Sequence, residues 1–217
     1  YEALQRGDAP DLPPPPPPYR EFITWLQRRD TSGAEAFWRE YLRGFAHPTK
    51  LDLGTPAAPG SGENGDYAEQ EIQVEAVDTA RLRAFARTHD LTLNTLLQGT
   101  WALLLGRYSN SEEVVFGAVR GGRRSTVPGA EEMIGLFINT VPVRVRLEGA
   151  TRVTPWLQSL RRQWRTLREY EHTPLTAVQG WSETPRRQAL FETILSVQDP
   201  AWDVALREGD AAWLRRP

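Results

Sequence analysis

The stretch that decides the fold lies at residues 133–147 and reads MIGLFINTVPVRVRL. The end of this stretch alternates, with valines and a leucine at 141, 143, 145 and 147 on one face and arginines at 144 and 146 on the other. A period of two predicts a strand with one buried face. Upstream, residues 114–119 read VVFGAV, a continuous apolar run that is typical of an interior strand. The second half of the chain is therefore expected to contain a sheet.

Helical periodicity dominates the segments around these two strands. A helix is expected from Ser32, with Ser32 or Thr31 as its cap. Thr92 is expected to cap a longer helix over residues 93–108, whose wide apolar stripe predicts a central, buried position. A further helix is expected to start at Thr154-Pro155, and a short helical piece to follow Pro174.

Two weaker strand patterns complete the prediction. Ile72, Val74 and Ala76 alternate with polar residues and predict a half-buried strand, after which Asp78 is expected to cap a short helix. The alternation over residues 191–197 predicts the last strand. The resulting order mixes helices and strands without a strict βαβ alternation. We therefore expect an α+β fold, with helices packed on one face of a mixed sheet.

Composition excludes several classes of protein. The chain has 217 residues, of which 25% are charged, and a formal charge of −2, so neither nucleic acid nor an anionic membrane is an expected partner. Cysteine is absent, which excludes disulfides, thiolate metal sites and cysteine nucleophiles. No apolar run is long enough to span a bilayer and no secretory signal is visible, so we expect a cytoplasmic protein. A start at Tyr1 rather than Met suggests a piece of something longer.

The usual catalytic patterns are absent from the sequence. The three histidines, His47, His89 and His172, lie far apart and none has metal-ligand spacing, so no metal site is expected. For His172 we favour a structural role, in which it stabilises the last carbonyls of a helix, over catalysis. The paired glutamates at 112–113 and 131–132 are interpreted as solvated surface, and the Gly-Arg loop after residue 119 lacks the phosphate-loop spacing.

One polar pair interrupts an otherwise apolar strand. Asn139 and Thr140 must be hydrogen-bonded if they are buried, because an unpaired buried polar group costs about 1–3 kcal/mol. The pair could order a neighbouring loop or face a substrate channel. Near the start of the chain, the prolines at 13–18 could form a stiff strap or a docking site, and we favour the strap because a helical pattern follows directly.

Several of these segments together resemble the condensation domains of nonribosomal peptide synthetases. Residues 19–25 read YREFITW and resemble the family motif Y-x-[DE]-[YF]-x-x-W, with Tyr19 and Trp25 at its ends. Residues 134–144 are similar to I-G-x-F-[VI]-N-T-x-x-x-R, which ends at Arg144. Residues 170–175 read YEHTPL where the family often has H-Q-D-x-P-F-E, so only Pro174 keeps its place clearly.

The resemblance implies a chloramphenicol-acetyltransferase-like fold of two lobes in a V, with the active site in a tunnel between them. Such domains join an acyl or peptidyl thioester on one carrier protein to the amine of an aminoacyl group on another. Their H-H-x-x-x-D-G motif lies in the first lobe, and this chain has no adjacent histidine pair. The chain therefore resembles the second lobe alone, and no catalytic residue is expected in it.

The resemblance also implies an organisation and a set of site residues. Residues 1–31 would be the end of a preceding helix plus the proline-rich strap, residues 32–200 the C-terminal lobe, and residues 201–217 a poorly matching tail. The residues expected at the substrate tunnel, or supporting the active site, are Gly135, Phe137, Asn139, Thr140 and Arg123. Arg123 would steady the loop beneath the catalytic histidine of the other lobe.

The expected partners are the first lobe of the same domain, carrier-protein domains and an adjacent adenylation domain. No cofactor is expected to bind directly, because the phosphopantetheine arms of the carriers arrive as parts of the substrates. Two alternatives stay open. One is a non-catalytic lobe that binds carriers or acts as a scaffold, and the other is an alcohol acyltransferase of the same superfamily.

Overall fold

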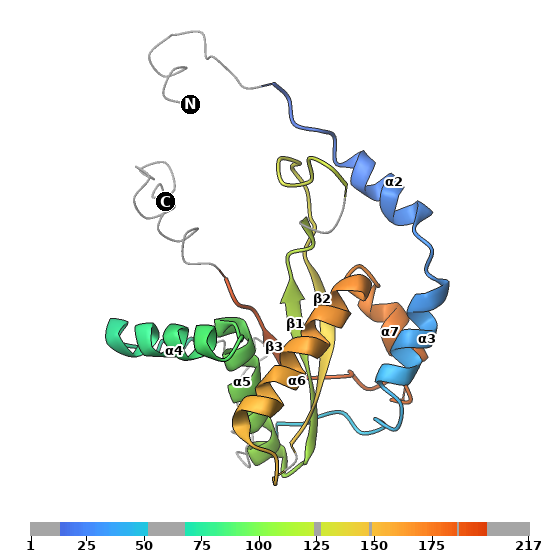
Figure 1. Ribbon diagram of the computed structural model, residues 1–217. Helices are drawn as coiled ribbons and strands as arrows, with labels where there is room; N and C mark the ends of the chain where they lie inside the picture. Colours follow the sequence, from blue (N-terminus) through green and yellow to red (C-terminus); the bar gives the residue numbers. More distant parts are fainter. Residues whose placement is uncertain (1–13, 52–67, 124–126, 148, 186, 199–217) are drawn as a thin grey trace.

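The structure, a computed structural model, describes residues 14–51, 68–123, 127–147, 149–185 and 187–198. Figure 1 shows the arrangement of the elements, which mix helices and strands along the chain as the sequence predicts. In chain order they are α2 (Arg20–Arg28), α3 (Ser32–Tyr41), α4 (Ala76–Thr88), α5 (Leu93–Ser109), β1 (Glu113–Arg120), β2 (Asn139–Arg146), α6 (Val153–Thr166), the 3-10 helix η2 (Leu167–Tyr170), α7 (Leu175–Trp181) and β3 (Ile194–Leu195).

The three strands form one mixed sheet in the order β2-β1-β3. β1 pairs antiparallel with β2 along its whole length, from Glu113 opposite Arg146 to Arg120 opposite Asn139. β3 runs parallel to β1 and pairs over two residues only, so the last predicted strand is shorter than its alternation indicated. The sheet and its helices confirm the expected α+β class.

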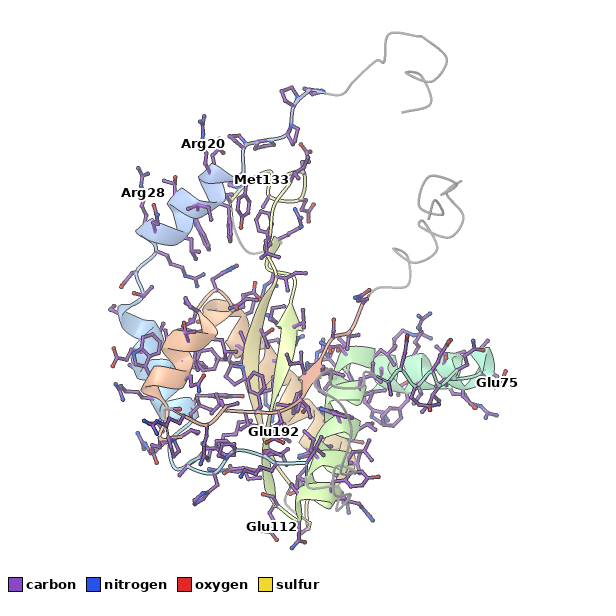
Figure 2. All side chains as sticks on the ribbon, turned by 180° about the vertical axis from the view of Figure 1, so that it is seen from behind. Arg20, Arg28, Glu75, Glu112, Met133 and Glu192 are labelled. Carbon is purple, nitrogen blue, oxygen red and sulfur yellow. The ribbon has the colours of Figure 1, made fainter. Side chains whose placement is uncertain are left out.

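The helices pack on one face of this sheet, where α6 crosses β1 and β2 with α5 alongside (Figure 1). On the other face, the segment after α7 crosses the strands (Figure 2). The Phe191 ring of that segment lies over Gly117, where a Cβ would come within 2.5 Å of the ring. A bare backbone at Gly117 is therefore what lets the crossing segment lie close to the sheet.

The main core lies between these layers. The facing pairs Val114–Val145, Phe116–Val143 and Ala118–Val141 are buried, which confirms the predicted apolar face of residues 141–145. Buried residues of α3, α5, α6 and α7 join the same cluster. A second, smaller cluster of buried residues lies apart, around α2.

The outer edge of β2 is closed by side chains. The Arg144 N–H donates to the Tyr41 hydroxyl at 2.8 Å, and the Arg144 carbonyl accepts from Gln163 Nε2 at 2.6 Å. Farther along the strand, the Arg146 carbonyl accepts from the Trp156 indole at 2.9 Å, whereas Pro142 has no N–H to offer. Burial raises the pKa of Tyr41 to about 12, against the effect of its hydrogen bonds, so the hydroxyl stays protonated at neutral pH.

The strand predicted around residues 72–76 is wrong. Residues 69–75 form no strand, and Ile72 and Val74 are 82% and 58% exposed. Alternation predicts a strand only where a neighbouring strand can pair with it, and no described strand lies beside this segment. Helix α4 begins at Ala76, so Asp78 lies in its first turn and is not its cap.

The predicted burial of residues 93–108 is only partly right. Helix α5 is capped by Thr92, whose Oγ1 accepts from the Thr95 N–H at 3.1 Å, as expected. However, α5 faces the core mainly with small and polar residues, whereas Leu97, Leu104 and Tyr108 are exposed on the opposite stripe. Apolar residues cover a wide arc of α5, so the sequence pattern alone did not predict which part of that arc faces the sheet.

The other predicted helix starts hold with small changes. Helix α3 starts at Ser32, but neither Ser32 nor Thr31 provides the side-chain cap, because the Ser32 N–H donates instead to the Asp30 carboxylate at 2.8 Å. Helix α6 starts one residue earlier than predicted, at Val153, and α7 follows Pro174 directly. The helix end expected at the start of residues 1–31, the first part of the proline-rich strap and the tail at 201–217 lie outside the described residues.

Candidate functional site

The candidate site lies at the end of the β1–β2 pair nearest α2 (Figure 1). Here β1 ends at Arg120 and β2 begins at Asn139, so the connecting segment and the turn before α7 meet at one place. The structure brings Arg123, Gly135, Phe137 and Asn139 to this end.

Asn139 ties β2 to the turn between η2 and α7. Its Nδ2 donates to the Glu171 carbonyl at 2.7 Å and to the Thr173 carbonyl at 2.9 Å. Both amide hydrogens are therefore used to satisfy backbone groups of two buried residues. Of the two roles considered for the polar pair, this geometry shows the ordering of a neighbouring segment.

Gly135 makes room for the ring of Tyr19. A Cβ at Gly135 would lie 2.1 Å from Tyr19 Cδ2, which is far inside van der Waals contact. The Tyr19 hydroxyl in turn donates to the Leu136 carbonyl. Because only glycine leaves this space, residue 135 and the start of α2 are fitted to each other.

Phe137 lies at the centre of the second cluster, which we call the α2 cluster. It is 4% exposed, and its ring centroid lies 4.4 Å from that of Phe22 and 5.4 Å from that of Tyr19. The members of the cluster are Phe22, Ala130, Met133 and Phe137, with Tyr19, Trp25, Leu26 and Val127 packed against them. Phe137 thus anchors α2 to the segment that leads into β2.

Arg123 binds the segment that leads into β2 through several backbone carbonyls. Its Nη1 donates to the carbonyls of Ala130 and Met133 at 3.0 and 2.6 Å, and its Nη2 donates to the Gly135 carbonyl at 3.2 Å. The guanidinium also lies 4.4 Å from the centroid of the Phe137 ring, a favourable cation–π distance. The planar fork of one arginine therefore fixes three successive parts of one loop.

Thr140 does not join this group. It follows Asn139 in the strand and so points to the opposite face of the sheet, where its Cγ2 lies 2.8 Å from the position of a Cβ at Gly117. Arg144 lies farther along β2, where it donates to both Glu113 carboxylate oxygens at 2.8 and 2.9 Å. Pro174 precedes α7 and serves as its N-cap residue.

Two charged residues of this region escaped the sequence prediction. Glu171 and Arg120 are both buried, and Arg120 Nε donates to the Glu171 carboxylate at 2.6 Å. The Arg120 guanidinium lies 4.0 Å from the centroid of the Trp164 ring. A charged residue directly after an apolar strand is the one signal that could have drawn attention to Arg120, but 51 residues separate it from its partner.

His172 lies against aromatic side chains of α2. Its ring packs edge-on against Trp25, with centroids 5.2 Å apart, and Nε2 is buried without a hydrogen bond among the described residues. Among the described residues, no hydrogen bond from this ring to a helix carbonyl is found, so the interaction with the last carbonyls of a helix stays a prediction. Burial lowers the pKa of His172 below its usual value, against the charge of Glu171 and together with Arg29 and Arg120.

Glu113 also differs from its interpretation as solvated surface. Its carboxylate accepts from Arg144 and, at 2.8 Å, from Arg146 Nε. Burial opposes ionisation of Glu113, but these hydrogen bonds outweigh it and hold the pKa below its ordinary value. The pair Glu131 and Glu132 is exposed, as expected.

The described residues contain no group of three or more histidine, aspartate or glutamate side chains placed to hold a metal ion. Within the same part of the chain, no helix has both the length and the apolar character needed to cross a membrane.

Comparison with known proteins gives a consistent result. The family model described as Condensation domain matches residues 1–211. The chain is 51% identical over 177 residues to a linear gramicidin synthase of Brevibacillus parabrevis, covering 82% of this chain and 2% of that protein. It is 34% identical over 208 residues to bacitracin synthase 1 of Bacillus licheniformis, covering 95% of this chain and 4% of that protein.

Solved structures show the same fold at low sequence identity. The X-domain from teicoplanin biosynthesis matches with a TM-score of 0.65 and 21% identity, over 88% of this chain and 44% of that one. The starter condensation domain of rhizomide synthetase RzmA matches with a TM-score of 0.66 and 16% identity, over 91% of this chain and 43% of that one. The chain thus spans less than half of each of these solved structures and a few per cent of the two synthases.

Proposed function

Because the chain belongs to the Condensation domain family of nonribosomal peptide synthetases, we propose that it forms the second lobe of a peptide-bond-forming domain. In this proposal residues 32–200 are the lobe itself, and residues 1–31 are the end of a preceding helix plus the proline-rich strap that leads to it. The reaction joins a carrier-bound acyl or peptidyl thioester to the amine of a carrier-bound aminoacyl group. The nitrogen attacks the thioester carbonyl, the C–S bond breaks, and the thiol leaves with the proton released from the amine.

The observation that carries this proposal is the anchoring of the segment that enters β2. Gly135, Phe137 and Asn139 are held by Tyr19, by the Arg123 fork and by the turn at 171–173. Each of these contacts fixes backbone, and the groups that make them are a phenol, a guanidinium and an amide, with no histidine or carboxylate side chain among them. Such a region supports the role of a rigid wall for a substrate tunnel, whereas the acid–base group comes from the first lobe.

The proposed partners follow from the same role. The first lobe would cover an apolar stripe of α5 formed by Leu97, Leu104 and Tyr108. Trp101 lies in this stripe and donates to Thr193 Oγ1 at 3.3 Å, which places the stripe beside β3. Carrier proteins would deliver their phosphopantetheine arms into the tunnel, and an adenylation domain would adjoin the lobe. We expect this assembly to work in the cytoplasm, in keeping with its similarity to bacterial synthases of antibiotic peptides.

The direct test measures peptide-bond formation by this lobe combined with a first lobe that carries the H-H-x-x-x-D-G motif. We expect the 217-residue chain alone to form no product from carrier-bound substrates and the combined lobes to form it. Product formation by the chain alone, at the rate of the combined lobes, would contradict the proposal.

A pair of variants tests the anchoring of β2. Asn139→Ala should lower the rate of the combined lobes or their stability, because two buried carbonyls lose their donor at a cost of about 1–3 kcal/mol each. Gln179→Ala is the matched control, since Gln179 Nε2 makes one bond, to the Gln188 carbonyl at 2.8 Å, near the surface. Equal rates and equal melting temperatures for the two variants would refute the role given to Asn139.

A further inference from the structure

Helix α6 and η2 present an unusual concentration of positive charge. Residues 151–170, which include both helices, contain five arginines and one acidic residue, Glu169, although the whole chain has a formal charge of −2. Four of these arginines, Arg161, Arg162, Arg165 and Arg168, are linked by helical spacings of three and four residues. We call this set the α6 arginine face.

The burial of α6 places these arginines on its outer side. Leu157, Leu160 and Leu167 are buried against the core, and Trp164 lies under Arg120. In Figure 1, α6 lies over the sheet, and no other described element covers its outer side. Arg162, Arg165 and Arg168 are exposed, whereas the Arg161 side chain keeps 17% of its surface exposed.

On α3 and α4, and just after α3, some exposed arginines have carboxylate partners close by in the sequence. Arg39 pairs with Glu35 at 2.8 Å on α3, and Arg43 pairs with Glu40 just after it. On α4, Arg81 pairs with Asp78 at 3.2 Å. These pairs, at spacings of three and four residues, neutralise Arg39, Arg43 and Arg81 locally.

The α6 arginine face is not balanced in this way. Arg161 pairs with Asp90, and the attraction of Arg161 and, more weakly, of Arg165 holds the pKa of Asp90 below its usual value. Among the described residues, no carboxylate forms an ion pair with Arg162, Arg165 or Arg168. Arg161 is therefore the one member of the face with an ion pair among the described residues, and the short helix that carries Arg168 adds a single glutamate, Glu169.

We propose that the α6 arginine face binds an acidic surface of a partner protein. From Arg161 to Arg168 the face extends over seven residue-to-residue steps, about 10 Å at 1.5 Å per step, which matches carboxylates spaced by one or two turns on another helix. Guanidinium groups bind carboxylates in a planar, two-pronged geometry. A long polyanion or an anionic bilayer would meet the net negative charge of the rest of the molecule, which disfavours both. This inference does not depend on the proposed reaction.

The test uses the 217-residue chain and a fluorescent helical peptide with glutamates every three to four residues along one face. Binding is measured by fluorescence anisotropy at low salt, because surface charges are already screened over about 10 Å at 0.1 M. The triple variant R162E/R165E/R168E should weaken binding about tenfold or more. The matched control R81E/R83E/R87E on α4 changes the net charge equally and should stay within about twofold.

The peptide with glutamine in place of glutamate should not bind. Equal losses in the two triple variants would overturn the proposal, because they would show a response to net charge alone. Absence of binding to the glutamate peptide by a chain with a native circular dichroism spectrum would also overturn it. Tighter binding to duplex DNA or to phosphatidylserine vesicles, lost in the α6 variant, would assign the face to another class of partner and refute the proposal.

Discussion

The main core and the α2 cluster are built in different ways. The main core buries the facing side chains of β1 and β2 together with residues of four helices. The α2 cluster buries only Phe22, Ala130, Met133 and Phe137, and owes its shape to individual fits such as Gly135 against Tyr19. A large core tolerates imperfect fits, whereas a small cluster depends on each one.

The two regions meet at the turn before α7. Asn139 bonds this turn from the side of the sheet, and the His172 ring contacts Phe22 and Trp25 from the side of α2. Because few contacts cross this boundary, we expect the α2 cluster to open locally without unfolding the main core. The following predictions test that expectation, from the largest effect to the smallest.

The largest effect is expected for Phe116→Ala. Phe116 is fully buried opposite Val143, so the variant leaves a cavity in the main core and should lose about 3–5 kcal/mol of unfolding free energy. Urea denaturation followed by circular dichroism measures the loss. Phe85→Ala, at a position 38% exposed on α4, is the control and should change the free energy much less. A similar loss in both variants would contradict the position of the core.

Phe137→Ala should act on the α2 cluster alone. It removes the central ring of the cluster, so amide exchange in α2 should accelerate and the fluorescence of Trp25 should shift toward that of an exposed indole. The free energy of global unfolding should fall by less than for Phe116→Ala. If exchange accelerates equally in β1 and α2, the two regions unfold as one unit and the comparison fails.

Gly135→Ala should loosen the same cluster by overpacking. The added methyl would lie 2.1 Å from Tyr19 Cδ2, and relieving such an overlap costs about 1–3 kcal/mol. Gly121→Ala is the control, since nothing lies within 4 Å of its added Cβ. In the background of Tyr19→Ala, the effect of Gly135→Ala should largely vanish. Equal effects with and without the Tyr19 ring would show that the ring is not what excludes a side chain at 135.

The smallest effect is a pH dependence of α2 docking. The pKa of His172 is lowered by burial, so the unfolded state binds more protons between the folded pKa and the unfolded value of about 6.5. The stabilising contribution is thus full above about pH 6.5 and is lost as the pH falls through that value toward the folded pKa. Glu171, Arg29 and Arg120 are the charged groups that act on the ring.

His172→Gln should flatten the pH dependence of exchange in α2 between about pH 5 and 7, a window set by the ordinary titration range of histidine. His89→Gln, at a ring that lies against Phe85 on α4, should leave it unchanged. An unchanged pH profile in the His172 variant would assign the dependence to another group.

Most of the helices and strands could be predicted from the pattern of apolar residues in the sequence. The helices at 32–41, 93–109 and 153–166 and the strand at 139–146 were predicted from the spacing of their apolar residues, and the strand at 113–120 was predicted from a continuous apolar run. Periodicity failed at Ile72 and Val74, since a strand also needs a neighbour. It failed to choose the buried side of α5, because small residues such as Gly99 and Ala102 pack more closely there than leucine could.

The candidate site was predictable only in part. Asn139 drew attention as a polar residue in an apolar strand, and Gly135 and Phe137 through the motif around it. The Arg120–Glu171 pair and the position of His172 depend on which distant segments the fold brings together. No local pattern contains that information, so these contacts required the structure.

The outer edge of β2 is closed by side chains, which limits where a further strand could pair with the sheet. Strand addition needs free N–H and C=O groups, and at Arg144 both are already bonded to side chains of α3 and α6. With Pro142 unable to donate, a foreign strand finds no template on this side. Any extension of the sheet must therefore occur beyond β3, and the β2 edge is protected from the edge-to-edge pairing that begins aggregation.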